Sequence, residues 1–332
     1  MNWAEVPNLF ELEKNMYHIQ RMFIVQKILK EYVTVEIREL TDSCKGLIDF
    51  IIKTFMVIMV KTSVAIVRGK HPSTMLESAL KLIDVERLIT PQDKVLIKPN
   101  YVVAKHPSTG LTTDSRILES IIEFVKGCGV KDIVVGEGGS GNTDRAFDVV
   151  GIREITTKQN VRLVNLNRDS RINIKIPNAL ALKEVGVART ALESTCIINV
   201  PKLKIHHMAV VTFSMKNLMG LILPKNIMHG QLHEKIVDLS SVFKDKVKIN
   251  IIDGLVGGEI DETTGSPVRM DLLITGQDMV AVDTVSTAIM GIDPRKVKYI
   301  TIAGEMGLGV SSLDEIQVLG ERIEDVKRQF RV

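Results

Sequence analysis

Aromatic residues are scarce in this chain of 332 residues, which has one Trp and four Tyr. Proteins that bind single-stranded nucleic acids stack the bases on aromatic side chains, so the scarcity argues against that class of protein. The formal net charge is +3, and the basic residues are spread along the chain. Duplex-binding proteins usually concentrate such residues on one face. We therefore expect no nucleic-acid partner, and a core made mostly of aliphatic side chains.

Cysteine is also rare. Cys44, Cys128 and Cys196 are far apart, and none belongs to a Cys-x-x-Cys pair. Three separated thiols cannot supply the four ligands of an iron–sulfur cluster or of a four-cysteine zinc site, so no iron–sulfur cluster is expected. An odd number of cysteines in a chain of this size indicates a reducing compartment. We predict a cytoplasmic location.

Long hydrophobic runs are missing as well. The most apolar stretch, residues 47–60, is interrupted by Asp49 and Lys53, and it is shorter than the roughly 20 residues that a membrane-spanning helix needs. Residues 1–20 carry acidic as well as basic groups and lack the apolar centre of a signal peptide. The sequence predicts a buried helix or strand over 47–60 and no association with a membrane.

The N-terminal region differs from the rest, because it has no glycine before Gly46 and no regular alternation of strands and helices. Two explanations stay open. Residues 1–57 are a genuine N-terminal extension, or translation starts at Met56 or Met59 and the preceding part is a gene-model artefact. We expect residues 58–320 to form a single α/β domain and residues 321–332 a C-terminal tail.

Beyond the N-terminal region, apolar strand patterns alternate with helical ones. The expected strands are 63–68, 94–98, 132–135, 162–165, 195–200, 247–252, 271–275 and 315–319, with 172–176 as a half-buried strand or hairpin arm. The expected helices are 73–89, 113–126, 144–150, 153–159, 208–223, 229–243, 279–290 and 295–304. This alternation predicts a Rossmann-like α/β fold, with a mostly parallel sheet and helices on both faces. Ligands of such sheets bind beyond the carboxyl ends of the strands.

The strongest candidate site is the segment 199–207, Asn-Val-Pro-Lys-Leu-Lys-Ile-His-His, which follows a buried strand. Because side chains alternate along an extended chain, Lys202, Lys204 and His206 are expected on one face. Pro201 should stiffen the turn before them. Two ammonium groups and an imidazole on one face would bind a phosphate or a carboxylate. The alternative is a solvated edge with ordinary surface lysines.

The helix expected over 208–223 would carry Thr212, Lys216 and Gly220 along one stripe, with Asn217 beside Lys216. Residues four apart lie on the same face of a helix. This stripe faces either solvent or the pocket of the segment 199–207, and the sequence leaves both possibilities open.

A glycine-rich segment, 136–141, separates an expected strand from the next helix. Backbone N–H groups can converge at such a turn and bind an anion, so Gly138 and Gly139 are candidate phosphate-binding residues. The segment also fits the dinucleotide pattern Gly-x-Gly-x-x-Gly. However, Asn165 and Asn167 stand where that site needs an acidic residue. A plain tight turn explains the glycines equally well.

His229 and His233 are four residues apart in an expected helix, which places both imidazoles on one face, as a metal pair requires. A divalent metal is therefore a candidate cofactor, with Asp238 or Asp253 as oxygen ligands. The zinc-protease pattern is incomplete, because Glu234 follows the second histidine instead of lying between the two. Ordinary helix histidines are the alternative.

These elements together resemble the family known as domain of unknown function 362. The matching segments are 95–100, 137–139, 198–206, 212–220, His233 with 238–239, 253–254, and 278–283 with Gly291. The resemblance implies a Rossmann-like α/β domain of prokaryotes with no settled reaction. Some members carry ferredoxin-type cysteine motifs, which this chain lacks. The resemblance also implies that one pocket contains Lys98, Asn100, Glu137, Lys202, Lys204, His206, Lys216, Asn217, Asp253 and Asp283.

We expect an enzyme that binds a small anionic or phosphorylated substrate in this Lys/His-lined crevice. The lysines would hold the anion, and His206 or Glu137 would transfer a proton. The alternative is a non-catalytic protein that binds or carries a metal or a cofactor. The sequence specifies neither the reaction nor the oligomeric state.

Overall fold

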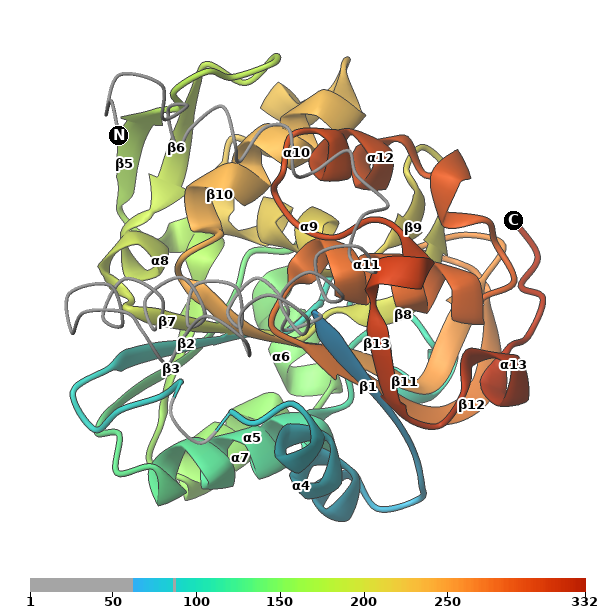
Figure 1. The fold of residues 1–332 in the computed structure, drawn as a ribbon. Helices are drawn as coiled ribbons and strands as arrows, with labels where there is room; N and C mark the ends of the chain where they lie inside the picture. The colour runs from blue at the N-terminus through green and yellow to red at the C-terminus, as the bar shows by residue number, and fades with distance from the viewer. Residues whose placement is uncertain (1–61, 86–87) are drawn as a thin grey trace, which may run out of the picture. The chain divides into compact units, whose positions relative to one another are not determined.

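The computed structural model describes residues 62–85 and 88–332 (Figure 1). The expected N-terminal extension 1–57, the alternative starts Met56 and Met59, the apolar stretch 47–60 and Cys44 lie outside the described residues. In the described part, no helix combines the length and the apolar character needed to cross a bilayer.

A large sheet forms the centre of the described part. Its strand order is β13 (Gln317–Gly320), β1 (Ser63–Arg68), β12 (Ser266–Gly276), β11 (Val247–Glu259), β7 (Cys196–Asn199), β2 (Lys94–Lys98), β3 (Asp132–Glu137) and β4 (Arg162–Asn165). In addition, β8 (Lys202–His206) pairs with β11, and β9 (Val210–Thr212) pairs with β8. Antiparallel pairing in this sheet is confined to β12 with its two neighbours and to β8 with β9. The mostly parallel sheet that the sequence predicted is therefore confirmed.

Helices cover both faces of this sheet (Figure 1). One core contains side chains of α4 (Pro72–Leu82), α5 (Ser115–Gly127), α6 (Thr143–Val149) and α7 (Ile152–Lys158). The opposite core contains side chains of α8 (Arg189–Glu193), α9 (Ser214–Asn217), α10 (Leu232–Phe243), α11 (Met279–Ile289), α12 (Lys298–Glu305) and α13 (Ile323–Val326). Leu96 of β2 packs into the second core, and Val95 and Ile97 pack into the first. This alternation is what a strand buried on both faces requires.

A smaller antiparallel sheet consists of β5 (Arg171–Lys175), β6 (Glu184–Ala188) and β10 (Ile222–Leu223). The β5–β6 pair confirms the hairpin arm expected at 172–176. The 3-10 helices of the described residues are η3 (Pro107–Thr109), η4 (Leu166–Arg168), η5 (Leu218–Leu221), η6 (Lys225–Met228), η7 (Pro294–Lys296) and η8 (Leu313–Glu315).

Residues 321–332, which the sequence suggested as a tail, pack against the domain. Phe330 is buried, and its N–H donates to Met290 O. Val326 of α13 joins the core on the same side of the sheet.

The helix predicted over 208–223 is wrong. The chain forms β9 instead, which pairs antiparallel with β8 and sets Lys204 opposite Thr212. The run Val210, Val211 and Thr212 is β-branched, which favours strands, and periodicity alone does not separate a short apolar strand from a helix. Only one helical turn, α9, follows before η5. Thr212 and Lys216 therefore reach the site from different elements.

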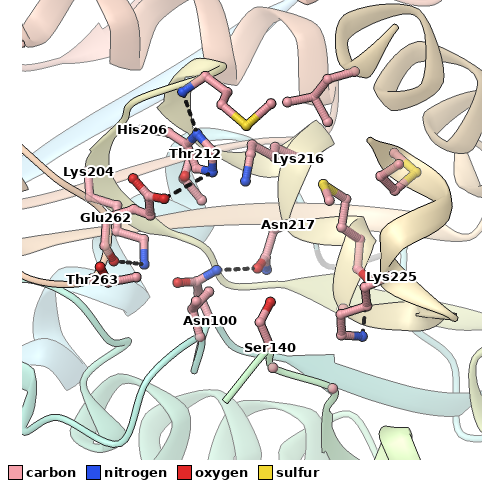
Figure 2. A pocket seen from close by; sticks show the side chains of 18 of the residues that line it. Asn100, Ser140, Lys204, His206, Thr212, Lys216, Asn217, Lys225, Glu262 and Thr263 are labelled. Atoms are coloured by element: carbon pink, nitrogen blue, oxygen red, sulfur yellow. Dashed lines mark hydrogen bonds and ion pairs between the residues drawn. The ribbon is translucent and has the colours of Figure 1, made fainter. Parts of the chain in front are cut away.

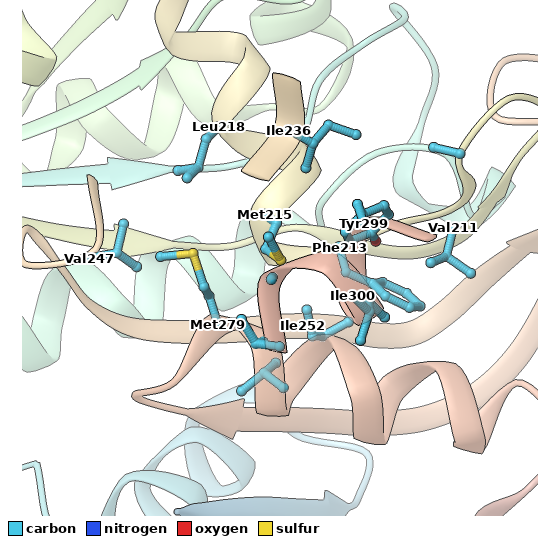
Figure 3. Close-up of a cluster of buried hydrophobic side chains, with 14 of the residues drawn as sticks. Val211, Phe213, Met215, Leu218, Ile236, Val247, Ile252, Met279, Tyr299 and Ile300 are labelled. Carbon is cyan, nitrogen blue, oxygen red and sulfur yellow. The ribbon is translucent and has the colours of Figure 1, made fainter. Parts of the chain in front are cut away.

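Figure 3 shows the apolar core that holds α9 in place. Phe213, Met215 and Leu218 are fully buried in this core, among side chains of β11, α10, α11 and α12. These three side chains fix one side of the short helical segment. Lys216 and Asn217 line the cavity described below, so apolar packing positions these two polar side chains.

Candidate functional site

A cavity of about 290 Å³ lies beyond the carboxyl ends of β2 and β3, beside the β8–β9 hairpin (Figure 2). Parallel α/β sheets bind their ligands in this position. Lys98 lies behind the cavity and is bonded to Glu137. The predicted site residues that line the cavity are Asn100, Glu137, Gly138, Gly139, Lys204, His206, Lys216, Asn217 and His229.

Glu137 is a fully bonded carboxylate. It accepts hydrogen bonds from Lys98 Nζ at 3.0 and 3.1 Å, from Tyr101 N at 3.1 Å and from Gly138 N at 2.7 Å. Burial lowers the pKa of Lys98, and the charge of Glu137 opposes this shift. A Cβ at Gly220 would overlap Glu137 Oε1, so a glycine is needed there for close approach. This ion pair is a rigid, neutral wall of the cavity.

Three asparagines form a chain of hydrogen bonds beside this pair. Asn217 Nδ2 donates to Asn199 Oδ1 at 2.8 Å, and Asn217 Oδ1 accepts from Asn100 Nδ2 at 2.8 Å. Lys98 Nζ also donates to Asn217 Oδ1 at 3.3 Å. Asn100 Oδ1 is buried and has no hydrogen-bond partner in the described residues. Asn100 lines the cavity, so a hydrogen-bond acceptor without a donor lies at the wall of the cavity.

Three lysines reach the cavity without an ion-pair partner in the described part of the chain. Lys204 Nζ donates to the carbonyls of Leu111 at 2.9 Å and Glu262 at 3.3 Å, and Lys225 Nζ donates to Ile222 O at 3.1 Å. Lys216 Nζ has no hydrogen bond at all among the described residues. The cavity thus carries a local excess of positive charge.

Burial shifts the titration of all three amines. It lowers the pKa of Lys204 to about 7, assisted by the neighbouring charge of Lys216. It lowers the pKa of Lys216 and of Lys225 to about 8. Desolvation disfavours the charged form of an amine. Each of these amines therefore exchanges between its charged and uncharged forms near neutral pH.

His206 is held as a neutral imidazole. Its Nδ1 accepts hydrogen bonds from Met208 N at 3.1 Å and Ala209 N at 3.2 Å. Nδ1 therefore carries no proton, and the ring proton is on Nε2. Burial, followed by the charge of Lys216, lowers the pKa of His206 well below its usual value. The Nε2–H of the ring faces Glu262 at the wall of the cavity, with Nε2 3.6 Å from Glu262 Oε1.

His207 and Glu262 lie next to His206. The two imidazoles are stacked with their centroids 4.9 Å apart, and His207 Nδ1 is 2.7 Å from Glu262 Oε1. One potential ligand atom from each of the three residues lies within 4.8 Å of the others, a spacing that a divalent ion could bridge. A metal-bound imidazole usually donates its second N–H, whereas His206 Nδ1 accepts two. His206 would have to change partners to bind a metal.

Besides Lys98 and His233, three predicted site residues do not line the cavity. Lys202 and Asp253 form a buried ion pair at 2.7 Å. Asp283 accepts hydrogen bonds from Ser214 N at 2.7 Å and Met215 N at 3.1 Å, and burial raises its pKa to about 7. Asp283 therefore fixes the start of the helical turn that carries Lys216. It is a positioning residue that does not itself line the cavity.

The predicted anion nest at Gly138 and Gly139 does not form. Gly138 N donates to Glu137 Oε1 at 2.7 Å, and Gly139 N donates to Thr143 Oγ1 at 3.1 Å. A Cβ at Gly139 would overlap Tyr101 O. These glycines line the cavity because the backbone packs closely here, which matches the alternative of a tight turn.

His229 and His233 do not share a helix, because α10 begins at Leu232. His229 lines the cavity, but His233 does not, and its ring stacks with Tyr299. Asp238, a suggested oxygen ligand, accepts three backbone N–H groups from residues 180–182. The i, i+4 metal pair predicted from the spacing is therefore not assembled.

Several residues that line the cavity carry no strong signal in the sequence. Lys225 has a weak signal in the sequence, because it lies five residues after Gly220, at the end of the polar stripe considered for the site. Glu262 lies in the loop between β11 and β12, and no local pattern marks it. Thr212 and Gly220 also line the cavity; they belong to the stripe for which the sequence left solvent and the pocket open. The lining residues that the sequence did not consider for the site are Val102, Ser140, His207, Met208, Met219, Lys225, Met228, Leu232, Glu262 and Thr263.

The chain is similar to three kinds of known protein. The family model described as Domain of unknown function (DUF362) matches residues 95–288. A thylakoid-associated protein of Synechocystis sp. is 23% identical over 274 residues, which cover 77% of this chain and 83% of that protein. The structure of the lactate racemase apoprotein from Thermoanaerobacterium thermosaccharolyticum matches with 16% identity and a TM-score of 0.40, and covers 65% of this chain and 54% of that protein. The chain belongs to the family described as Domain of unknown function (DUF362).

Proposed function

We propose that this protein is an enzyme that binds a small organic anion, a phosphate ester or a carboxylate, and moves a proton to or from it. The observation that supports this proposal is the convergence of Lys204, Lys216 and Lys225 on one cavity, without a carboxylate partner in the described residues. A cytoplasmic location, without nucleic-acid or membrane partners, is part of the same proposal.

An anion would complete this arrangement. Unpaired ammonium groups are costly in a buried site, and the lowered pKa values of the three lysines reflect that cost. A negative group in the cavity compensates by Coulomb attraction, which is strong where water is excluded. The volume of about 290 Å³ is near the lower end for ligand pockets. A small metabolite fits such a volume better than a dinucleotide does.

Lys216 is the best candidate for the proton-transfer group. Its amine has no partner in the described structure, and its pKa of about 8 leaves a useful uncharged fraction near neutral pH. His206 would donate its Nε2–H to negative charge that develops on the substrate. Glu137 fits the transfer role less well, because Lys98 and two backbone N–H groups already hold its carboxylate.

Calorimetric titration with phosphate esters and dicarboxylates would test the binding step. We expect Lys216→Met to weaken anion binding roughly 10-fold or more, because it removes a charged hydrogen-bond donor. The exposed Lys131 provides the control, and Lys131→Met should bind as the parent does. Equal affinities of Lys216→Met and Lys131→Met for every anion would contradict the proposal.

The catalytic step has its own test. Ligands that bind would be incubated with the protein in D2O, and mass spectrometry would measure the deuterium that each ligand incorporates. An enzyme that moves a carbon-bound proton should exchange it for deuterium, and Lys216→Met should exchange it more slowly. Binding without exchange in any ligand would favour a carrier.

Metal binding is the second candidate function, and the cluster of His206, His207 and Glu262 favours it. Metal analysis after gentle purification would test it. Stoichiometric metal that is lost in Glu262→Gln, together with an absence of deuterium exchange, would support a metal-binding or carrier protein.

A further inference from the structure

Asn100 lines the cavity, and its neighbours dictate the orientation of its amide group. Lys98 Nζ can only donate, so the atom of Asn217 that faces it at 3.3 Å must be the oxygen. The Asn217 amide nitrogen then donates to Asn199 Oδ1 at 2.8 Å and to Pro99 O at 3.3 Å. Since Asn217 Oδ1 can only accept, Asn100 must turn its own nitrogen toward it. Asn100 Oδ1 is consequently left free on the other side.

This free oxygen is a departure from the usual rule for buried polar atoms. Asn100 is 4% exposed, and its Oδ1 has no hydrogen-bond partner in the residues that the structure describes. Buried polar groups nearly always have a partner, and an unpaired one costs stability. Asn100 is one of the residues that line a cavity of sufficient size for a ligand. A ligand with a donor group would supply the missing bond.

Thr212 adds a second unpaired group in the same cavity. It is 2% exposed, and its Oγ1 also lacks a hydrogen-bond partner within the described residues. The β8–β9 register sets it opposite Lys204, and both residues line the cavity. A hydroxyl can donate as well as accept, so Thr212 suits an anionic oxygen or a hydroxyl of the ligand.

We infer that the ligand of this cavity is an organic anion that also carries a hydroxyl group, and that Asn100 Oδ1 recognises this hydroxyl. The inference rests on the proposed function for the anionic part. A hydroxyl is favoured over an ammonium as the donor, because Lys204, Lys216 and Lys225 would repel a second cation. Asn100 is thus a specificity-determining residue.

Matched pairs of anions separate the hydroxyl from the charge. Calorimetric titration of the full chain would compare malate with succinate, and glycerol 3-phosphate with propyl phosphate. The hydroxylated member of at least one pair should bind roughly 10-fold tighter or more, because a site built to bond a hydroxyl strongly rejects the analogue without it. Aspartate, with an ammonium in place of the hydroxyl, should bind more weakly than malate.

Two variants assign the preference. Asn100→Ala should reduce the affinity ratio of the preferred pair to about 1, whatever its effect on overall affinity. Lys216→Met should weaken both members of the pair and keep the ratio. Circular dichroism would confirm that both variants fold. If Asn100→Ala did not fold, Asn100→Leu, which has a similar shape and no acceptor, would replace it.

Each other outcome has a distinct meaning. If both members of every pair bind equally to the parent, the hydroxyl assignment is wrong and the anion proposal survives. If a preference exists and persists in Asn100→Ala, Asn100 does not recognise the hydroxyl. If no anion of any pair binds, the proposed function fails and this inference fails with it.

Discussion

Lys98 Nζ and Glu137 Oε2 are 3.0 Å apart, at the carboxyl ends of the neighbouring parallel strands β2 and β3. Both side chains are buried. Lys98 also donates to Asn217 Oδ1, and Glu137 also accepts from Tyr101 N. The pair therefore joins two strand ends to the turn that carries Lys216. The two charges of the pair cancel, so the positive charge of the cavity comes from Lys204, Lys216 and Lys225.

Removing one partner of this pair should be more costly than removing both. Lys98→Met leaves the Glu137 carboxylate buried without its cation, which typically costs about 3–5 kcal/mol of unfolding free energy. Lys98→Met combined with Glu137→Gln should be less destabilising than Lys98→Met alone, because it leaves no buried charge without a partner. Urea denaturation near neutral pH would measure all three. A loss in Lys98→Met no larger than that in the exposed control Lys131→Met would show that the pair does not stabilise the fold.

Gly220 should tolerate no side chain. A Cβ there would overlap Glu137 Oε1 and lie 2.6 Å from Lys98 Nζ, both of which are held by other bonds. We expect Gly220→Ala to lower the unfolding free energy by about 1–3 kcal/mol and to weaken anion binding.

Gly127→Ala is the matched control, because the added Cβ meets no described atom within 4 Å apart from its chain neighbours and the backbone of its own helix. At the end of α5, alanine should be neutral or slightly stabilising. Thermal unfolding would compare the two variants, and equal melting temperatures would contradict the close packing at Gly220.

The sequence predicted the part of the site that local geometry determines. Lys202, Lys204 and His206 follow a buried strand and lie on β8, as alternation indicated. Whether each lysine is paired depends on residues far away in the sequence. Asp253 forms an ion pair with Lys202, whereas Lys204 donates to backbone carbonyls and has no carboxylate partner in the described residues. Such pairing is set by tertiary packing, which periodicity does not report.

Two other failures have the same physical origin. Glu262 contacts His207 across 55 residues of sequence, and no pattern near Glu262 signals that contact. The antiparallel strand β12 lies between β1 and β11, although alternation of strands and helices predicts only that parallel pairing dominates. Strand order and long-range ion pairs depend on contacts between distant segments, which local sequence patterns do not report.

Anion affinity should fall as the pH rises through the lysine titrations. Burial lowers the pKa of Lys204 to about 7 and of Lys216 and Lys225 to about 8. A bound anion favours the charged amines, so binding should take up protons, and affinity should be lower above these pKa values than below them.

Titrations with malate from about pH 6 to pH 10 would measure this dependence, and repeating them in buffers of different ionisation enthalpy would count the protons taken up. Lys216→Met should take up fewer protons than the parent. An affinity that rises with pH would contradict the assignment of these lysines to the anion.

His206 should remain neutral, with its proton on Nε2, across the physiological pH range. Protonation of Nδ1 would break the hydrogen bonds from Met208 N and Ala209 N, and burial lowers the pKa of the ring further. Long-range 1H–15N NMR of the imidazole would identify the unprotonated nitrogen directly. Titration of this ring near its ordinary pKa of 6.5 would contradict the assignment.

A pair of substitutions separates the two nitrogens of His206. Asn in place of His206 can supply an acceptor near the position of Nδ1, whereas Gln can place an N–H near the position of Nε2. We expect His206→Asn to keep the turn at Met208 protected from hydrogen exchange and to weaken anion binding. We expect His206→Gln to bind anions better than His206→Asn but to exchange faster at Met208. The reverse order in both measurements would mean that Nδ1, and not Nε2, serves the ligand.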